Sequence, residues 1–415
     1  MKIKRLLSLL LLALLLCSLI SCTPNDTLPD TEPPHETLPN TKPPHETLPD
    51  TEPSLDKLMN AALLLKPEGQ TPTEIHILCT REVCDSLVVD YENAFTNWER
   101  ASFERLLELQ SRLNVTLVPF VPELREGESF WEVAVRYLAA TDSEVDLVIG
   151  PSSEPIPAML FPLLSKLSDC RDPSGNDFFA YMPSDRLAQN EYFVNGRLLS
   201  SYHGSALVTL LNHKLAGISV SGPSELRQSV TEGSWTLDTL VTLAKSKELP
   251  IACKEDTLAA TLSLAFGCEQ EDAAVTEAIA SLRAEGVLLD TDDPFKAFTE
   301  ERALAVFMPI GTPLGDAFSF TTALPLPKKD TAQGAYQTGA PNGFDIIAVN
   351  QKSEKKALSA AAILILEALS DEDCQHAYFR DIYACLCLCE SRKIWEETEK
   401  VCKEGCIFRK IALDK

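Results

Sequence analysis

The pattern of apolar and polar positions divides this chain into three parts. The first is a predominantly apolar run over residues 6–20, which follows three basic residues, Lys2, Lys4 and Arg5. A bilayer-spanning helix needs about 20 apolar residues, and this run is shorter. A basic start followed by a short apolar run and small residues is typical of a removable export signal. We therefore expect residues 1–21 to be a cleaved signal peptide.

The second part is a repeat. Residues 27–56 contain three copies of a ten-residue unit that begins Thr-Leu-Pro. Proline recurs every few positions, fixes φ and removes backbone donors, so the segment favours polyproline II at roughly 3.1 Å per residue. Its reach is then on the order of 100 Å. We interpret His35 and His45 as polar spacers rather than a metal pair, and predict that residues 22–56 form a stalk.

In the third part, short apolar runs alternate with segments whose apolar residues recur at helical spacing. Helical spacing over residues 103–113 predicts one helix, and Ser129 with Glu132 three residues later is a capping box that predicts the start of another. Strands joined by helices imply right-handed crossovers and a mostly parallel sheet. The runs predict three strands, over residues 74–79, 115–120 and 145–149.

Further helical patterns predict a second α/β lobe. Thr236 suits the N-cap of a helix whose apolar face begins with Leu237 and Leu240, and Val275 and Leu282 mark another such face. Residues 74–415 are long enough for two domains, each with its own core.

Charge restricts the classes of partner. The chain carries a net charge of −24, and removing residues 1–21 takes away three basic residues and no acidic one, which leaves −27. Such an acidic protein is poorly matched to nucleic acid or to anionic lipid headgroups. The richest later apolar segment, residues 357–369, is too short to span a bilayer. We expect no nucleic-acid partner.

The residues Leu19-Ile20-Ser21-Cys22 resemble the lipobox of bacterial lipoproteins. In those proteins diacylglycerol is attached to the cysteine thiol, and cleavage leaves that cysteine as the new N-terminus. The resemblance implies lipid attachment at Cys22 and a location on the outer face of the bacterial cytoplasmic membrane. The alternative is an ordinary secretory signal in which Cys22 is incidental.

Seven motifs follow one another along the rest of the chain. They are Val145-Asp-Leu-Val-Ile149, Asn195-Gly-Arg-Leu198, Leu210-Leu-Asn212, Ser234-Trp-Thr-Leu-Asp238, Phe298-Thr-Glu-Glu-Arg-Ala303 with Val306-Phe-Met308, Ala323-Leu-Pro-Leu-Pro327, and Ile346-Ile-Ala-Val-Asn350. In this order they resemble the motifs of the family 1 extracellular solute-binding proteins, typified by the bacterial maltose-binding protein, which are the substrate-capturing components of ABC importers.

The resemblance implies an α/β, two-lobed fold of the periplasmic-binding-protein type (type II), with a ligand cleft between discontinuous lobes joined by a hinge. Lobe I would comprise residues 74–208 and 326–368, and lobe II residues 209–325 and 369–415. The resemblance also implies a monomer without a cofactor or catalytic residues. Such a protein captures a small solute, here a sugar or oligosaccharide, and presents it to ABC permease subunits.

Candidate ligand-binding residues come from the loops that follow strands, because ligands of open α/β sheets bind beyond the carboxyl ends of the strands. Aromatic faces together with hydroxyl and amide groups suit a neutral polyol such as a sugar. For each residue taken singly, a role in loop structure or core packing is the alternative. The candidates are Ser152, Ser153, Tyr202, His203, Ser205, Thr312, Tyr336, Asn342 and Phe344.

Two positions depart from the family pattern. Leu211 stands where the family often has an aromatic residue, and Thr312-Pro313 stands where it often has tryptophan. The set of sugar-stacking rings is therefore thinner than usual. A different solute, or a ligand-sensing or interaction lipoprotein that does not transport, is the alternative interpretation.

An enzyme is the main hypothesis from another class. The sequence has no Gly-x-Ser-x-Gly elbow, no His-Glu-x-x-His motif and no phosphate-binding glycine loop. His203 and Ser205 lie two residues apart in a loop, where side chains seldom align for proton transfer. We expect no hydrolase activity.

Thirteen cysteines are present, of which Cys17 leaves with the signal and Cys22 is the lipid site. An odd number remains, so the chain cannot pair all of them internally. A C-terminal cluster could offer soft ligands to zinc, but a helix would turn its middle member away from its neighbours. We therefore favour buried thiols, or one or two disulfides, over a metal site at this cluster. Its candidate ligands are Cys385, Cys387, Cys389, Cys402 and Cys406.

Overall fold

The computed structural model describes residues 60–87, 92, 94–171, 175, 177–179, 191–195, 198–218, 224–340, 343–370, 377–379, 381, 396, 398, 400 and 406–407. The chain divides into two units, Met1–Asp50 and Thr51–Lys415, and all described residues belong to the second. The predicted signal peptide, Cys22 and the stalk lie outside the described residues, as do Asn342 and four of the candidate metal ligands, Cys385, Cys387, Cys389 and Cys402.

The first sheet has the strand order β2-β1-β3-β11-β4. Strand β1 runs parallel to β2 and β3, whereas β11 runs antiparallel to both β3 and β4. The strands predicted over 74–79 and 115–120 are confirmed to within one residue, and the third begins two residues later than predicted. The bounds are β1 Thr73–Cys79, β2 Val115–Phe120, β3 Leu147–Pro151, β4 Val194–Asn195 and β11 Asp345–Val349.

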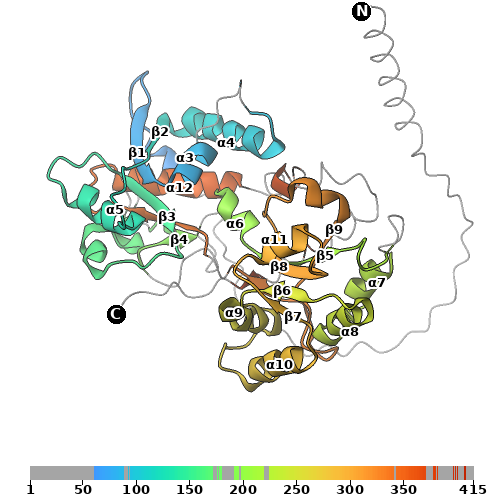
Figure 1. Ribbon diagram of the computed structural model, residues 1–415. Helices are drawn as coiled ribbons and strands as arrows, with labels where there is room; N and C mark the ends of the chain where they lie inside the picture. Colours follow the sequence, from blue (N-terminus) through green and yellow to red (C-terminus); the bar gives the residue numbers. More distant parts are fainter. Residues whose placement is uncertain are drawn as a thin grey trace, which may run out of the picture. The chain divides into compact units, whose positions relative to one another are not determined.

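Helices bury both faces of this sheet. Ile75 and Ile77 of β1 pack with the apolar residues of α3 (Arg81–Leu87), α4 (Asn97–Leu113) and α12 (Lys356–Leu369). Leu78, which points to the opposite face, packs with α5 (Phe130–Ala139) and the 3₁₀ helix η2 (Ala158–Leu163). Figure 1 shows α12 and α5 beside the strands of this sheet. Strands covered on both faces read as continuous apolar runs, which is why the sequence pattern finds them.

Capping residues set the starts of these helices. The predicted capping box is confirmed, because the Ser129 side chain accepts a hydrogen bond from the Glu132 backbone N–H and the Glu132 side chain accepts one from that of Ser129. Thr96 and Glu99 form a second capping box at α4. This helix ends at Asn114, whose φ of 53° is a left-handed C-cap.

The second sheet has the order β7-β6-β8-β5-β9. Helices α7 to α10 pack on one face, and α11 packs on the other (Figure 1). The predicted N-cap Thr236 is confirmed. The bounds are β5 Leu207–Asn212, β6 Ile251–Cys253, β7 Leu288–Asp290, β8 Ala305–Pro309, β9 Thr321–Leu324, α7 Ser224–Thr231, α8 Leu237–Lys247, α9 Glu255–Phe266, α10 Ala273–Ala284, α11 Pro294–Thr299 and the 3₁₀ helix η6 Gly315–Phe320.

The chain crosses between the two sheets more than once. The first crossing joins β4 to β5 through the short helix α6 (Ser200–Gly204), and the second joins β9 to β11 through residues 325–344. The second crossing carries β10 (Thr338–Gly339), which pairs in parallel with β12 (Cys406–Ile407). The first sheet therefore takes strands from before and after the second sheet in the sequence. The exact boundaries of the lobes stay a prediction.

In each sheet, an antiparallel pair of strands places the start of one strand beside the end of its neighbour. In the first sheet Asp345, the start of β11, pairs with Pro151, the end of β3. In the second sheet Leu207, the start of β5, pairs with Pro309, the end of β8.

Among the described residues, the longest apolar helices fall short of what a membrane crossing needs.

Candidate functional site

A cavity of about 410 Å³ lies at these strand ends, and we call it the interlobe cavity. The first sheet contributes α3 and the start of β11, the second contributes the residues around the end of β8, and the crossing at α6 lies between them. Its described lining residues are Glu82, Val83, Ser86, Leu199, Ser200, Ser201, Gly204, Ser205, Pro309, Gly311, Thr312, Gly343, Asp345 and Tyr378.

Two glycines on the wall of the interlobe cavity allow two backbone segments and a tyrosine side chain to approach one another closely. The Gly311 N–H donates a hydrogen bond of 3.0 Å to the Gly204 carbonyl oxygen. A Cβ added at either glycine would collide with the hydroxyl of Tyr378. These positions are therefore glycine because the tyrosine hydroxyl occupies the space that a side chain would need.

Tyr378 is positioned by a contact remote in sequence. Asp381, three residues later, accepts hydrogen bonds of 2.8 Å from the backbone N–H groups of Asn97 and Trp98 at the start of α4. Burial, together with the charge of Asp381, raises the pKa of the Tyr378 hydroxyl to about 12. Tyr378 therefore keeps its proton at neutral pH.

Two acidic side chains line the same cavity. Burial raises the pKa of the Asp345 carboxyl above its usual range, a hydrogen bond with the Ser201 side chain lowers it in part, and the charge of Glu82 raises it again. The Ser201 hydroxyl also accepts a 3.2 Å hydrogen bond from the Asp345 backbone N–H. The lining residues that the structure describes include no lysine, arginine or histidine.

Of the predicted ligand-binding residues, Ser205 and Thr312 line the interlobe cavity. Ser152 lies at its edge in a structural role, because its Oγ accepts a 3.0 Å hydrogen bond from the Phe344 N–H. Ser153 is exposed and lies against Gly343, whose φ is 79°. Phe344 is buried in the core of the first lobe.

Tyr202 and His203 belong to an aromatic cluster behind the cavity. The buried His203 ring lies 5.4 Å from that of Trp98 and 5.7 Å from that of Tyr378, measured between centroids. Tyr202 makes edge contacts with His203 and with Phe344. Both residues thus pack beneath the cavity wall, and neither is among the described residues that line it.

Tyr336 lies elsewhere, packed against the core of the second sheet, although the predicted boundaries put it in lobe I. Its hydroxyl accepts a 3.2 Å hydrogen bond from the Trp235 N–H and donates one of 3.3 Å to the Ser229 carbonyl oxygen. The Lys328 ammonium lies 5.1 Å from the centroid of its ring. The structure therefore does not bring Tyr336 to the interlobe cavity.

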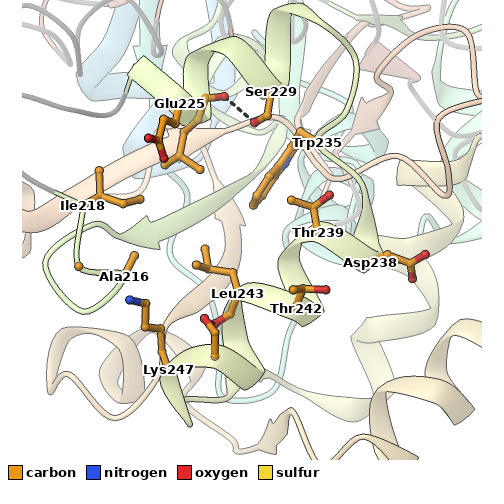
Figure 2. Close-up of a pocket in the computed structure, with 13 residues that line it drawn as sticks. Ala216, Ile218, Glu225, Ser229, Trp235, Asp238, Thr239, Thr242, Leu243 and Lys247 are labelled. Atoms are coloured by element: carbon orange, nitrogen blue, oxygen red, sulfur yellow. Dashed lines mark hydrogen bonds between the residues drawn. The ribbon is translucent and has the colours of Figure 1, made fainter.

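A larger cavity, of about 920 Å³, lies within the second lobe alone (Figure 2). Its walls come from the turn at residues 216–218 and from α7, α8 and the loop between these helices. Several of its polar side chains bond within the protein: Ser229 donates to the Leu226 carbonyl, and Trp235 Nε1 donates to that of Pro325. Unlike the interlobe cavity, it is lined by residues of the second lobe alone.

The candidate metal ligands of the C-terminal cysteine cluster lie outside the described residues, apart from the backbone of Cys406 in β12. Elsewhere among the described residues, histidine, cysteine, aspartate and glutamate side chains do not gather in threes as a metal site would need. Cys79, Cys84, Cys170 and Cys253 are free thiols.

Comparison with known proteins identifies the fold of this chain. The sequence matches no family model and no curated protein. The structure is similar to the cyclic alpha-maltosyl-1,6-maltose binding protein from Arthrobacter globiformis, with a TM-score of 0.50 and 12% identity, covering 82% of this chain and 89% of that one. It is also similar to the galacto-N-biose-/lacto-N-biose I-binding protein of the ABC transporter from Bifidobacterium longum, with a TM-score of 0.49 and 11% identity, covering 82% and 88%. The first of these likenesses, together with the sheet topology, shows that the chain has the two-lobed α/β fold of the extracellular solute-binding proteins.

Proposed function

We propose that this chain is a lipid-anchored solute-binding protein on the outer face of the bacterial cytoplasmic membrane. It captures a sugar or oligosaccharide and presents it to the permease subunits of an ABC importer. The observation that carries the proposal is the interlobe cavity, which both lobes and the α6 crossing line together. The protein from Arthrobacter globiformis, which shares the fold, binds a cyclic oligosaccharide according to its name.

The cavity suits capture by closure of the lobes. Its lining offers the hydroxyl groups of Ser205 and Thr312, which can exchange hydrogen bonds with a polyol. A ligand that contacts both lobes favours the closed arrangement, because only that arrangement completes its contacts. The lipid at Cys22 and the stalk would keep this movement close to the membrane.

A thermal-shift screen of the purified lipoprotein in mild detergent against sugars and oligosaccharides tests the proposal. A ligand present at about 1,000 times its Kd stabilises the folded state by about 4 kcal/mol, which raises the melting temperature by several degrees. We expect such a shift with at least one sugar class. The absence of a shift with every sugar, from a protein that melts cooperatively, would overturn sugar capture.

A matched pair of variants locates the site. Thr312→Ala removes a hydroxyl from the interlobe cavity, whereas Thr242→Ala removes one from the larger cavity of the second lobe. We expect only Thr312→Ala to weaken the ligand-induced shift. The reverse result would place binding in the larger cavity. A ligand that binds without its uptake depending on this protein would favour the sensing role over transport.

A further inference from the structure

Two cysteine thiols lie together where β1 ends and α3 begins. Cys79 is the last residue of β1, and Cys84 lies within α3. The Cys84 backbone N–H donates a 3.0 Å hydrogen bond to the Thr80 carbonyl oxygen, so a single turn of chain separates the two cysteines. Both side chains pack in the core of the first lobe, and their thiols share a hydrogen bond. The fold therefore brings two free thiols into contact.

The two thiols differ in their access to solvent. Cys84 is half-buried and can meet a small oxidant, whereas Cys79 is fully buried. Disulfide formation by thiol–disulfide exchange needs an accessible thiol that attacks first and a neighbouring thiol that resolves the mixed disulfide. The pair offers one thiol for each role. The proposed location of the protein, outside the cytoplasm, is one in which disulfides persist.

We propose that Cys79 and Cys84 are a reversible redox modification site, at which an intramolecular disulfide fixes α3 to β1. The oxidant is a low-molecular-weight disulfide. The Cys84 thiolate attacks one of its sulfur atoms and releases one thiol, which leaves a mixed disulfide on Cys84. The Cys79 sulfur then loses its proton to solvent and displaces the second thiol. Two protein S–H bonds become one S–S bond, and the oxidant takes up the two electrons as two thiols.

The order of the two steps follows from the environment of each sulfur. Burial raises the pKa of the Cys79 thiol to about 12, which makes Cys79 a poor first nucleophile. Once the mixed disulfide stands on Cys84, the attack by Cys79 is intramolecular. Contact between the two sulfurs then gives a high effective concentration, which compensates for the small thiolate fraction.

The disulfide would act on a wall of the interlobe cavity. Val83 and Ser86, which lie on either side of Cys84 in α3, line that cavity. An S–S bond of about 2.05 Å is shorter than any hydrogen bond between thiols, so its formation draws α3 toward β1 and holds it there. The redox state of the pair therefore sets the position of one cavity wall. This role goes beyond the proposed function and does not depend on which solute is captured.

Peptide mapping without reduction tests the proposal. The purified lipoprotein in mild detergent is incubated with oxidised glutathione at about pH 8, blocked with N-ethylmaleimide and digested with trypsin. Trypsin cleaves after Arg81, and the peptides on either side, residues 58–81 and 82–100, contain one cysteine each. We expect mass spectrometry to find these two peptides linked, and dithiothreitol to separate them.

Three variants assign the roles. Cys79→Ser removes the resolving thiol, so glutathione should stay on Cys84 as the mixed disulfide. Cys84→Ser removes the attacking thiol, so Cys79 should acquire neither a link nor glutathione. Cys268→Ser removes another half-buried thiol, at the core of the second sheet, and should leave the link unchanged. Thermal melts of the reduced variants show whether each one is folded.

Hydrogen exchange measures the effect on the cavity wall. We expect oxidation to slow the exchange of the α3 amides by roughly tenfold in the unsubstituted protein and to leave it unchanged in Cys84→Ser. If residues 58–81 and 82–100 stay unlinked in the unsubstituted protein, with or without glutathione on Cys84, the proposal is overturned. A link that leaves the exchange of α3 unchanged would overturn its action on the cavity. Neither result bears on sugar capture, which the thermal-shift screen tests separately.

Discussion

Gly204→Ala is the substitution whose effect the structure defines most sharply. Gly204 is the last residue of α6, and its φ is not in the left-handed region, so alanine there would ordinarily stabilise the helix by about 0.5–1 kcal/mol. The added Cβ would, however, collide with the Tyr378 hydroxyl. Overpacking of this kind costs about 1–3 kcal/mol, so we expect a net loss of roughly 1–2 kcal/mol.

Tyr378→Phe provides the decisive second variant. Without the hydroxyl, the nearest atoms to a Cβ at position 204 are the ring carbon Cζ of residue 378 at 3.3 Å and the Gly311 Cα at 3.5 Å. Alanine at 204 should then be neutral or stabilising relative to Tyr378→Phe alone. At Gly311 the rescue should be incomplete, because a Cβ there would still lie 2.9 Å from the Gly204 Cα.

Urea unfolding of the four proteins in each double-mutant cycle measures these changes in the free energy of unfolding. We expect a coupling energy of about 1–3 kcal/mol between positions 204 and 378, and a smaller one between 311 and 378. Equal destabilisation by Gly204→Ala in the tyrosine and phenylalanine backgrounds would refute the steric reasoning.

Burial lowers the pKa of His213, so its stabilising contribution is complete above the unfolded pKa of 6.5 and is lost as pH falls through the lower folded value. His213→Gln should therefore flatten the drop in melting temperature between about pH 7 and pH 5; an unchanged drop would contradict this. Burial raises the thiol pKa of Cys79 and Cys170 to about 12 and that of Cys253 to about 11. Iodoacetamide at about pH 8 should label these thiols far more slowly in the folded protein than in urea, as followed by mass spectrometry; similar rates would show that they are accessible. Thr96→Ala removes the N-cap of α4 and should lower the free energy of unfolding by about 1 kcal/mol, measured in urea; no change would mean that water replaces the cap.

The sequence predicts those elements of the fold that have an apolar pattern or a cap signature extending over several residues. Strands β1 and β2 have long apolar patterns, and the capping boxes at Ser129 and the N-cap at Thr236 have local signatures. Strands β4 and β10 have two residues each, which is too short for any period to be recognised. Such strands form because the rest of the sheet is already in place.

The cavity residues were predicted only in part, for a reason of strand direction. Ser205 and Thr312 were candidates because they lie in loops beside strands, and they line the interlobe cavity. Asp345 was not predicted because β11 is antiparallel to β3, so the start of the strand, rather than the loop after it, lies at the edge that lines the interlobe cavity. Tyr378 reaches the cavity through the contact of Asp381 with α4, a long-range interaction that leaves no local pattern in the sequence.

The place of β11 in the first sheet has a consequence for how the protein is made. Residues 345–349 form the strand between β3 and β4, both of which leave the ribosome more than a hundred residues earlier. Until β11 arrives, β3 and β4 each expose an unpaired edge, and the first lobe cannot complete its core. Pairing over such a separation closes a long loop and is slow. The chain should consequently stay incompletely folded throughout its synthesis, and any truncation before residue 345 should aggregate through those edges rather than yield an independent first lobe.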